Sequence, residues 1–355
     1  MKEKSDGQSL FSGKRRGCLG YLGRGVIGIV ILLAAAMAAG AIYQAAASAA
    51  DARKYPPPGE LVDVGGRRLH LYCTGTGGPT VILEAGAASP ALVWYLVQEN
   101  VAGFTRVCSY DRPGFGWSDP ASGPLSSEQV AATLHQLLVN AKVPGPYILV
   151  GHSIGGVYVR SYAQLYPSEV AGIVLVDSSH ESQNLRFPPA YLKVANQQAG
   201  TMKALELLSP FGVLRAARIW SLLIPESPLP ADVGVAVWAT MYRTTYCRAM
   251  NDEMAAIARM VTRPQGPASL GDMPLSVLSA NDSITKTPET AVNAMGRDTF
   301  TRLVQVSKEL QQELASLSTQ GRQIIVKDSG HYIQWDQPDV VVDAIQTIMD
   351  QVGAQ

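Results

Sequence analysis

The residues best suited to chemistry stand at positions 151–155, where the chain reads Gly-His-Ser-Ile-Gly. An apolar run at 147–150 precedes them, and a run with helical character at 156–166 follows. A serine in a tight turn between a strand and a helix has its hydroxyl lifted clear of the sheet, and the flanking glycines let the two backbones approach closely. The motif predicts Ser153 as the nucleophile of an acyl-transfer hydrolase. An ordinary glycine-rich turn has the same pattern, so the prediction needs further features in its support.

A histidine is needed beside such a serine, because a hydroxyl is a poor nucleophile at neutral pH and imidazole titrates near that pH. His331 ends a loop of small residues that follows the last predicted strand, and we expect it to be the general base. His180, which follows the strand predicted at 172–176, is the reserve. The side chain of His152 should point away from the serine hydroxyl. The two other histidines, expected to be structural, are His70 and His135.

The acid that orients the histidine should lie at the same edge of the sheet, where the carboxyl ends of parallel strands meet. Asp282 follows the strand predicted at 274–280, and Asp177 follows the strand predicted at 172–176. Asp282 gives the chain order serine, aspartate, histidine that is usual for this kind of site. Asp282 is therefore the predicted acid and Asp177 the alternative, which would otherwise cap the next turn of backbone.

Two backbone N–H groups should face the oxyanion of the tetrahedral intermediate, and losing one such donor typically costs about 3 kcal/mol. The first is the N–H of Ile154, which directly follows the nucleophile and opens a helix whose dipole favours negative charge. The second comes from the loop after the strand predicted at 80–83. Ala87 is the best candidate there, because Gly86 before it permits a sharp turn.

Strands and helices alternate over residues 60–180 and again over 271–355, which predicts a mostly parallel sheet with helices on both faces. A hairpin at the start supplies an antiparallel edge. Residues 181–270 contain no clear strand, several helical patterns and many prolines, and they are predicted to form a helical cap. An apolar stripe at helical spacing runs from Val235 to Ile257. It is expected to be a packing face, with a lid face over an acyl pocket as the alternative.

Residues 25–50 carry no charge, and a cluster of basic residues precedes them. A helix of this length, at about 1.5 Å per residue, can cross a hydrocarbon layer of about 30 Å. The basic flank predicts that residues 1–24 are cytoplasmic, that 25–50 form a signal anchor, and that the catalytic part, joined by a linker at 51–59, is extracytoplasmic. The alternative is a cleaved signal peptide, because Ala-Ser-Ala at 47–49 resembles a cleavage site, and the protein would then be secreted.

Composition narrows the class of protein further. The 355 residues have a formal net charge of zero, which argues against a nucleic-acid partner, since such a partner needs a basic face. The hydrophobic share of 47% suits a sheet buried on both faces. The histidines are scattered and no Cys-x-x-Cys occurs, so no metal or other cofactor is expected. No obligate protein partner is evident.

Three motifs together resemble the α/β-hydrolase superfamily, in the branch with a helical cap (the AB hydrolase-1 type). They are Tyr-Asp-Arg-Pro-Gly-Phe-Gly-Trp-Ser at 110–118, Gly-His-Ser-Ile-Gly-Gly at 151–156, and Ser-Gly-His at 329–331. The resemblance spans about residues 60–352 and implies an eight-stranded sheet with the cap inserted after strand 6. Where the family often has His-Gly in the oxyanion loop, this chain has Ala85-Gly86, which keeps the backbone donor but changes the side-chain support of the loop.

The resemblance also implies a function. Relatives that open epoxides have an aspartate where Ser153 stands, so Ser153 implies a carboxylic-ester hydrolase acting on a small apolar ester or lipid-like substrate. The alternatives are an amide hydrolase of the prolyl-aminopeptidase type, a cofactorless haloperoxidase-like enzyme and an inactive membrane-tethered binding protein. In this fold the strands that contain Cys73 and Cys108 are neighbours, which implies a disulfide. The expected pocket liners are Trp94, Trp117, Trp220 and Trp238.

Overall fold

One eight-stranded sheet forms the centre of the computed structural model, which describes residues 15–223, 227–281 and 289–353. The strand order is β1-β2-β4-β3-β5-β6-β7-β8; β2 pairs antiparallel with both β1 and β4, and the remaining pairs, from β4–β3 to β7–β8, are parallel. This is the sheet that the alternation of elements predicts. The strands are β1 Glu60–Asp63, β2 Arg68–Thr74, β3 Thr80–Glu84, β4 Val107–Tyr110, β5 Tyr147–His152, β6 Val170–Val176, β7 Leu275–Ala280 and β8 Gly321–Val326.

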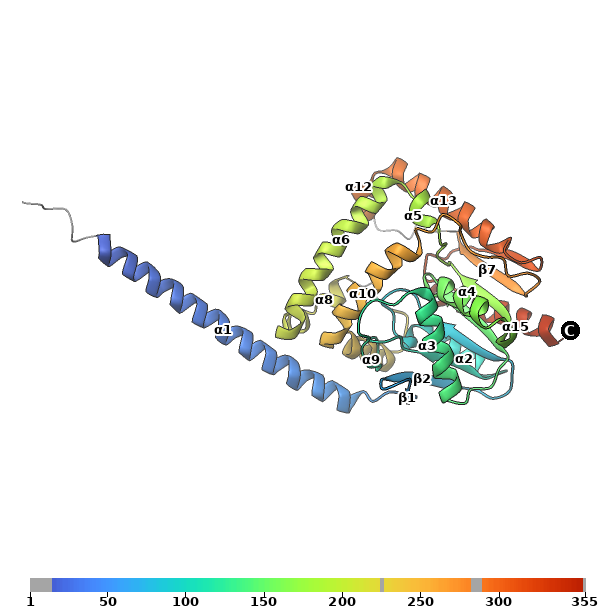
Figure 1. Ribbon diagram of the computed structural model, residues 1–355, viewed down its shortest axis with the longest axis horizontal. Helices are drawn as coiled ribbons and strands as arrows, with labels where there is room; N and C mark the ends of the chain where they lie inside the picture. The colour runs from blue at the N-terminus through green and yellow to red at the C-terminus, as the bar shows by residue number, and fades with distance from the viewer. Residues whose placement is uncertain (1–14, 224–226, 282–288, 354–355) are drawn as a thin grey trace, which may run out of the picture.

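Helices cover both faces of the sheet, because the central strands are apolar on both sides (Figure 1). Ile82 of β3 and Leu149 of β5 belong to the core cluster that contains α3 (Ser127–Asn140), α4 (Gly155–Leu165) and α13 (Arg297–Ala315). Alternate residues of the same strands, such as Val81 and Val150, belong to a second cluster with α2 (Tyr95–Val101) and α15 (Pro338–Gly353). Side chains along a strand alternate between the two faces, so each strand contributes to both cores.

A helical cap is inserted between β6 and β7, as predicted. Residues 235–257 do not form one continuous helix, because Arg243 is extended (ψ 142°) and its guanidinium donates to the carbonyl oxygen of Gly116 at 2.5 Å. Tyr246 and Met250 pack with Phe115 in a separate cluster, so the middle of this stripe is a packing face, whereas Val235 and Met254 are exposed. The cap helices are α5 Gln183–Arg186, α6 Pro189–Leu208, α7 Val213–Ala216, α8 Ile219–Leu223, α9 Ala231–Met241 and α10 Thr244–Met260, with the short 3-10 turn η3 at Ser209–Phe211.

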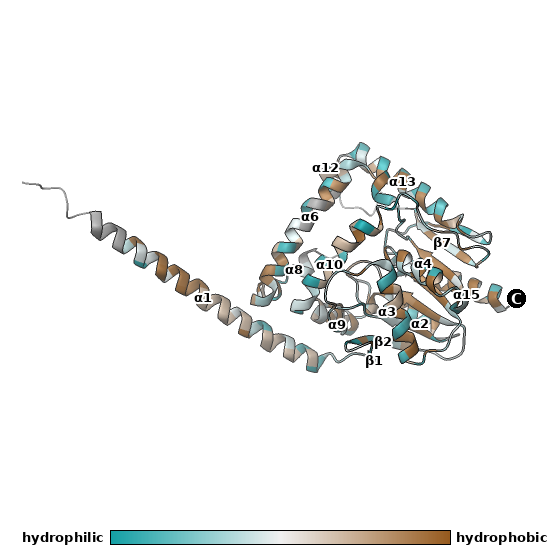
Figure 2. Ribbon diagram, viewed as in Figure 1, coloured by the Kyte–Doolittle hydropathy of each residue, from teal (hydrophilic) through white to brown (hydrophobic). Residues whose placement is uncertain are grey.

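The N-terminal helix α1 (Arg15–Lys54) is 40 residues long. Within it, Tyr21–Lys54 is long and apolar enough to cross a membrane. The expected linker at 51–59 is partly helical, since α1 continues to Lys54. Much of α1 projects free of the rest of the molecule, and its most hydrophobic turns lie in that free part (Figure 2). Its C-terminal half packs against η3 and α9.

A disulfide joins Cys73 of β2 to Cys108 of β4, as the resemblance implies. The two cysteines are direct partners in the antiparallel register of these strands. The bond therefore fastens the antiparallel edge to the parallel part of the sheet.

Replacing both cysteines by serine should lower the free energy of unfolding by about 3–4 kcal/mol, because the cross-link closes a loop with a sequence separation of 35. Urea titration followed by circular dichroism measures the change. Cys247→Ser is the control, since Cys247 is a buried free thiol and its replacement removes no cross-link. Wild-type protein whose unfolding midpoint is unaffected by a reductant would contradict the expectation.

Candidate active site

Ser153 lies at the tip of the turn between β5 and α4 with a φ of +54°, a left-handed conformation that is uncommon for any residue other than glycine. The glycines around it are required because the backbone there leaves no room for a Cβ atom. A Cβ at Gly151 would lie 2.7 Å from the backbone of Gly155, and a Cβ at Gly155 would lie 2.6 Å from the carbonyl oxygen of Glu84. The turn therefore has the strained geometry of a nucleophile elbow, with the serine side chain only partly buried.

His331 is paired with Asp177. Its Nδ1 lies 2.7 Å from Oδ2 of Asp177, which leaves Nε2 as the ring nitrogen available to a reacting group. The imidazole is about half exposed, whereas the carboxylate is 17% exposed. Asp282, the acid predicted from the sequence, lies outside the described residues. The carboxylate that the structure brings to His331 is the alternative, Asp177.

Asp177 is held by the neighbouring strand β7. It directly follows β6, its N–H donates to the carbonyl oxygen of Leu278, and its Oδ1 accepts a hydrogen bond from the N–H of Ala280 in β7 at 3.1 Å. Its φ of +40° is again left-handed. Such strain persists only where surrounding bonds enforce it, and it is common at functional sites. The position after β6 was the sequence signal for this residue.

The predicted oxyanion donors, Ala87 and Ile154, come from two adjoining segments. A Cβ built on Gly86 would lie 3.3 Å from Cβ of Ser153, so the loop after β3 passes directly against the elbow. Across the described part of the chain, neither the N–H of Ala87 nor that of Ile154 donates a hydrogen bond within the protein. Two unpaired donors beside a nucleophile are what a developing oxyanion requires.

Arg112 holds the oxyanion loop in place, a role that the sequence did not reveal. Its guanidinium donates to the carbonyl oxygens of Ala85 at 2.8 Å and Gly86 at 2.6 Å, and to carboxylate oxygens of Glu84 at 2.6 Å and Glu253 at 2.7 Å. Burial acts to lower the pKa of Arg112, but the two carboxylates raise it well above its ordinary value, so the group stays charged. The motif at 110–118, which contains Arg112, was the feature of the sequence that could have pointed to this role.

Glu253 extends this network into the cap. It lies on α10, and its second carboxylate oxygen accepts the N–H of Ala88 at 2.6 Å. Because Ala88 has a φ of +54°, this bond supports a strained turn directly after the predicted donor Ala87. The cap therefore takes part in shaping the loop that faces the nucleophile. In this chain, which has Ala85-Gly86 where the family often has His-Gly, Glu253 supplies side-chain support to the loop.

His152 is buried behind the nucleophile, and its Nε2 donates to the carbonyl oxygen of His331 at 2.9 Å. Burial, together with the nearby ring of His331, holds the pKa of His152 well below its usual 6.5, so the ring is neutral at neutral pH. A Cβ on Gly86 would lie 2.7 Å from its Nδ1. His152 therefore packs between the predicted oxyanion loop, at Gly86, and the loop that contains His331, and it sets the distance between these two loops.

The cavity that contains Ser153, Asp177 and His331 has a volume of about 600 Å³. Its apolar wall comes mostly from α13, with contributions from the start of α6 and from the end of α12 (Glu289–Met295), and not from the stripe on α9 and α10. Apolar and aromatic liners are Phe187, Tyr191, Met295, Phe300, Leu303 and Val304. His180 also lines it, but its Nδ1 is engaged by Ser182 and its Nε2 lies 3.6 Å from Glu313, so the reserve histidine is a structural neighbour of the site.

The four tryptophans expected to line the pocket do not line this cavity. Trp94 is fully buried in the core beside His152, and Trp220 donates its indole N–H to the carbonyl oxygen of Met241 inside the cap. Trp117 donates to the carbonyl oxygen of Tyr55, and Trp238 packs within the cap cluster. Their indole rings stabilise the fold, and the wall of the cavity is built from other side chains.

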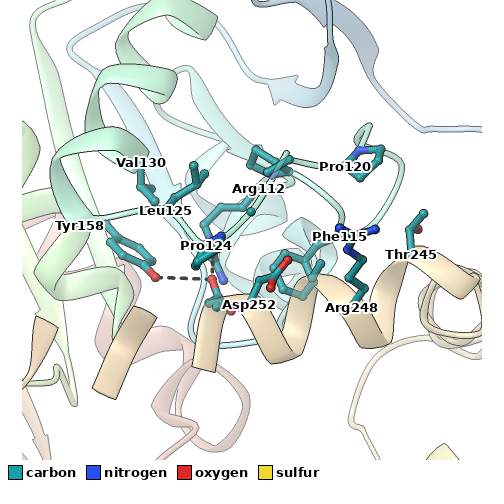
Figure 3. A pocket seen from close by; sticks show the side chains of 15 residues that line it. Arg112, Phe115, Pro120, Pro124, Leu125, Val130, Tyr158, Thr245, Arg248 and Asp252 are labelled. Carbon is teal, nitrogen blue, oxygen red and sulfur yellow. Dashed lines mark hydrogen bonds and ion pairs between the residues drawn. The ribbon is translucent and has the colours of Figure 1, made fainter. Parts of the chain in front are cut away.

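A second cavity, of about 140 Å³, lies between α10 and the loop after β4 (Figure 3). Arg112 and Tyr158 approach it from the core, and Arg248 and Asp252 from α10. Ser153 does not line it.

Comparisons with known proteins identify the family to which the chain belongs. The alpha/beta hydrolase family profile matches residues 81–344, and the chain belongs to that family. An uncharacterized protein of Schizosaccharomyces pombe is 38% identical over 151 residues, which cover 34% of this chain and 28% of that protein. The chain thus spans less than a third of the length of this relative.

Two solved structures illustrate the range of chemistry on this fold. A thermophilic esterase from Thermogutta terrifontis has a TM-score of 0.56 at 21% identity, covering 82% of this chain and 97% of its own. An epoxide hydrolase from Bacillus megaterium has a TM-score of 0.59 at 14% identity, covering 82% of this chain and 100% of its own. At these identities the likeness establishes the fold, and the reaction must be argued from the site.

Gly86→Ala should lower kcat by about 10²–10³-fold, the usual effect of losing one oxyanion donor, with little change in KM. The added methyl group would press on His152 and Ser153 and displace the loop. Ester hydrolysis measures the effect. Gly123→Ala is the matched control, because open space surrounds its Cβ position. A Gly86→Ala protein with wild-type kcat and an unchanged unfolding midpoint would contradict the assignment.

The depressed pKa of His152 predicts a loss of stability in acid. The unfolded chain binds a proton at this residue below about pH 6.5 and the folded chain does not, so the free energy of unfolding falls by up to about 1.4 kcal/mol per pH unit as the pH drops from 6.5 towards the lower folded pKa. His152→Gln should flatten this slope. Urea titrations across the acid range test it, and parallel slopes for wild type and variant would refute it.

Proposed function

We propose that the protein is a serine carboxylic-ester hydrolase whose triad is Ser153, His331 and Asp177. The observation that carries the proposal is the 2.7 Å contact between His331 and Asp177 in the same cavity as a serine held at positive φ. A nucleophile, a base and an acid that orients the base are the parts that acyl transfer by serine requires. Membership of the family does not by itself determine the reaction, so the proposal rests on these residues.

In the proposed mechanism, Ser153 attacks the acyl carbon and His331 takes the serine proton at Nε2. The carboxylate of Asp177 keeps the proton of Nδ1 in place and stabilises the imidazolium that forms. The N–H groups of Ile154 and Ala87 bind the oxyanion. His331 then donates its proton to the leaving alcohol, and water releases the acid from the acyl-enzyme by the same steps in reverse order.

The composition of the cavity favours an ester over an aminoacyl amide. A peptidase of the prolyl-aminopeptidase type needs cap acids to bind a substrate amine. Among the described residues that line the cavity, Asp177 is the one acid, and it already pairs with His331. Three acids of the cap are paired with other residues: Glu181 binds Arg160, Glu206 binds Asn251 and Glu253 binds Arg112. The apolar wall formed by α6 and α13 suits an acyl chain.

The proposal places the enzyme on a membrane. Residues 25–50 would anchor it with the N-terminus in the cytoplasm and the catalytic part outside, because the basic residues precede the apolar stretch. The disulfide between Cys73 and Cys108 is in keeping with an oxidising space. Cleavage after the Ala-Ser-Ala segment at 47–49 would instead release the catalytic part.

Ser153→Ala should abolish turnover of p-nitrophenyl acyl esters and labelling by a fluorophosphonate probe. Asp177→Asn should lower kcat by about 10⁴-fold, the usual effect of losing the orienting acid, while labelling slows and is not abolished. Asp282→Asn, the matched comparison, should change kcat little. Larger losses in Asp282→Asn than in Asp177→Asn would assign the acid to Asp282. Labelling of the Ser153→Ala protein would overturn the nucleophile.

A further inference from the structure

The cap is in tight contact with the proposed membrane anchor. A Cβ built on Gly40 of α1 would lie 2.3 Å from the carbonyl oxygen of Phe211, so the two backbones touch. One turn further on, the side-chain amide of Gln44 donates to the carbonyl oxygen of Tyr242 at 2.6 Å and is buried. An ion pair between Arg215 and Asp51 continues this contact. The position of the cap along α1 is therefore fixed.

The length of α1 sets the height of that contact relative to a bilayer. A hydrocarbon layer of about 30 Å takes up about 20 helical residues, and more if the helix is tilted. A charge inside the layer is costly, so the layer begins no earlier than Gly25, after Arg24. It then reaches at least to about residue 44. Gly40 lies inside the layer in every such placement, and Phe211, whose carbonyl oxygen touches Gly40, must therefore enter the layer near its boundary.

The cap surface at this height is apolar and uncovered. Leu207 and Leu208 at the end of α6 are 75% and 43% exposed, and Val213 at the start of α7 is 43% exposed. Adjacent exposed aliphatic side chains on one edge of a domain mark a surface that contacts another apolar phase. The flanking cations Lys203 and Arg218 are exposed, and their long side chains can extend to lipid headgroups at the edge of such a surface.

The same helix connects this surface to the catalytic cavity. Tyr191, in the first turn of α6, lines the cavity of Ser153, and Leu207 lies in the last turn. Figure 1 shows α6 running from the neighbourhood of α1 across to α12 (Glu289–Met295), at the side of the cap from which α1 projects. A bilayer around the projecting part of α1 would therefore face α6.

We propose that the cap surface formed by Leu207, Leu208 and Val213 docks into the leaflet of the membrane that α1 crosses, on the side of the catalytic domain. This rests on the proposed anchoring of the protein by α1. The occupant of the surface is the lipid bilayer itself. Docking holds α6, and the cavity behind it, at the headgroup level.

Single cysteines at 207 and 213, carrying an environment-sensitive fluorophore, test the proposal in the full chain after Cys18→Ser. The protein is reconstituted into vesicles of phosphatidylcholine and phosphatidylglycerol, with or without a lipid bearing a nitroxide high on its acyl chain. Leu207→Cys and Val213→Cys should lose most of their emission to the nitroxide lipid and little to aqueous iodide. Val139→Cys and Leu165→Cys, exposed aliphatic positions on the catalytic core, are matched controls and should show the reverse.

A label at Leu32→Cys separates failure of the docking from failure of the anchoring. Quenching of Leu32 by lipid without quenching of position 207 overturns the docking and leaves the anchor intact. No lipid quenching at either position overturns both. Protection of position 207 from iodide and from the nitroxide lipid alike would mean that a protein, such as a second copy, covers the surface, and this also overturns the proposal. Ester hydrolysis and fluorophosphonate labelling are measured separately on the same samples, so the catalytic assignment is judged independently.

Discussion

The buried guanidinium of Arg112 is the interaction on which the site depends. It binds Glu84 from the sheet, Glu253 from the cap and two carbonyl oxygens of the oxyanion loop. Burial raises the pKa of Glu84, but the charge of Arg112 and the hydroxyl of Tyr110 oppose this effect. Breaking a buried ion pair by removing one partner typically costs about 3–5 kcal/mol. The loop therefore keeps its shape, because another arrangement would leave buried charged groups without partners.

A second constraint is the meeting of loops at one edge of a parallel sheet. Ser153, Asp177 and His331 follow β5, β6 and β8, which are close in the strand order, so their loops converge without long connections. His152 then determines how close the loops come, because it is bonded to the backbone of His331 and packed under Gly86. The neutral ring is essential to this role, since a charged imidazole in that place would lack solvation.

The alternation of strands and helices, and glycines spaced around a serine, were sufficient to predict the sheet, the cap and the elbow. These patterns are visible in the sequence because they involve neighbouring residues or a simple periodicity. Chain order favoured Asp282 over Asp177 as the acid, although both follow a strand that ends at the same edge; the contact of Asp177 with His331 joins residues 154 positions apart and has no local pattern in the sequence. The tryptophans were misplaced for a similar reason: hydrophobic size shows that a side chain will be buried but not which cluster will receive it. The pairing of Arg112 with Glu253 joins residues 141 positions apart and left no local pattern.

The close approach of Gly40 to Phe211 has a mechanical consequence. A protein on a long, pliable tether samples a large volume and can reach dissolved molecules at many distances and angles. Here the helix and the cap are in backbone contact, and α1 continues as a helix to within a few residues of β1. The connection between α1 and the catalytic domain is therefore rigid, with little freedom of rotation. Under the anchoring proposed above, a catalytic domain mounted in this way stays close to the membrane surface, where it meets molecules that diffuse within the bilayer.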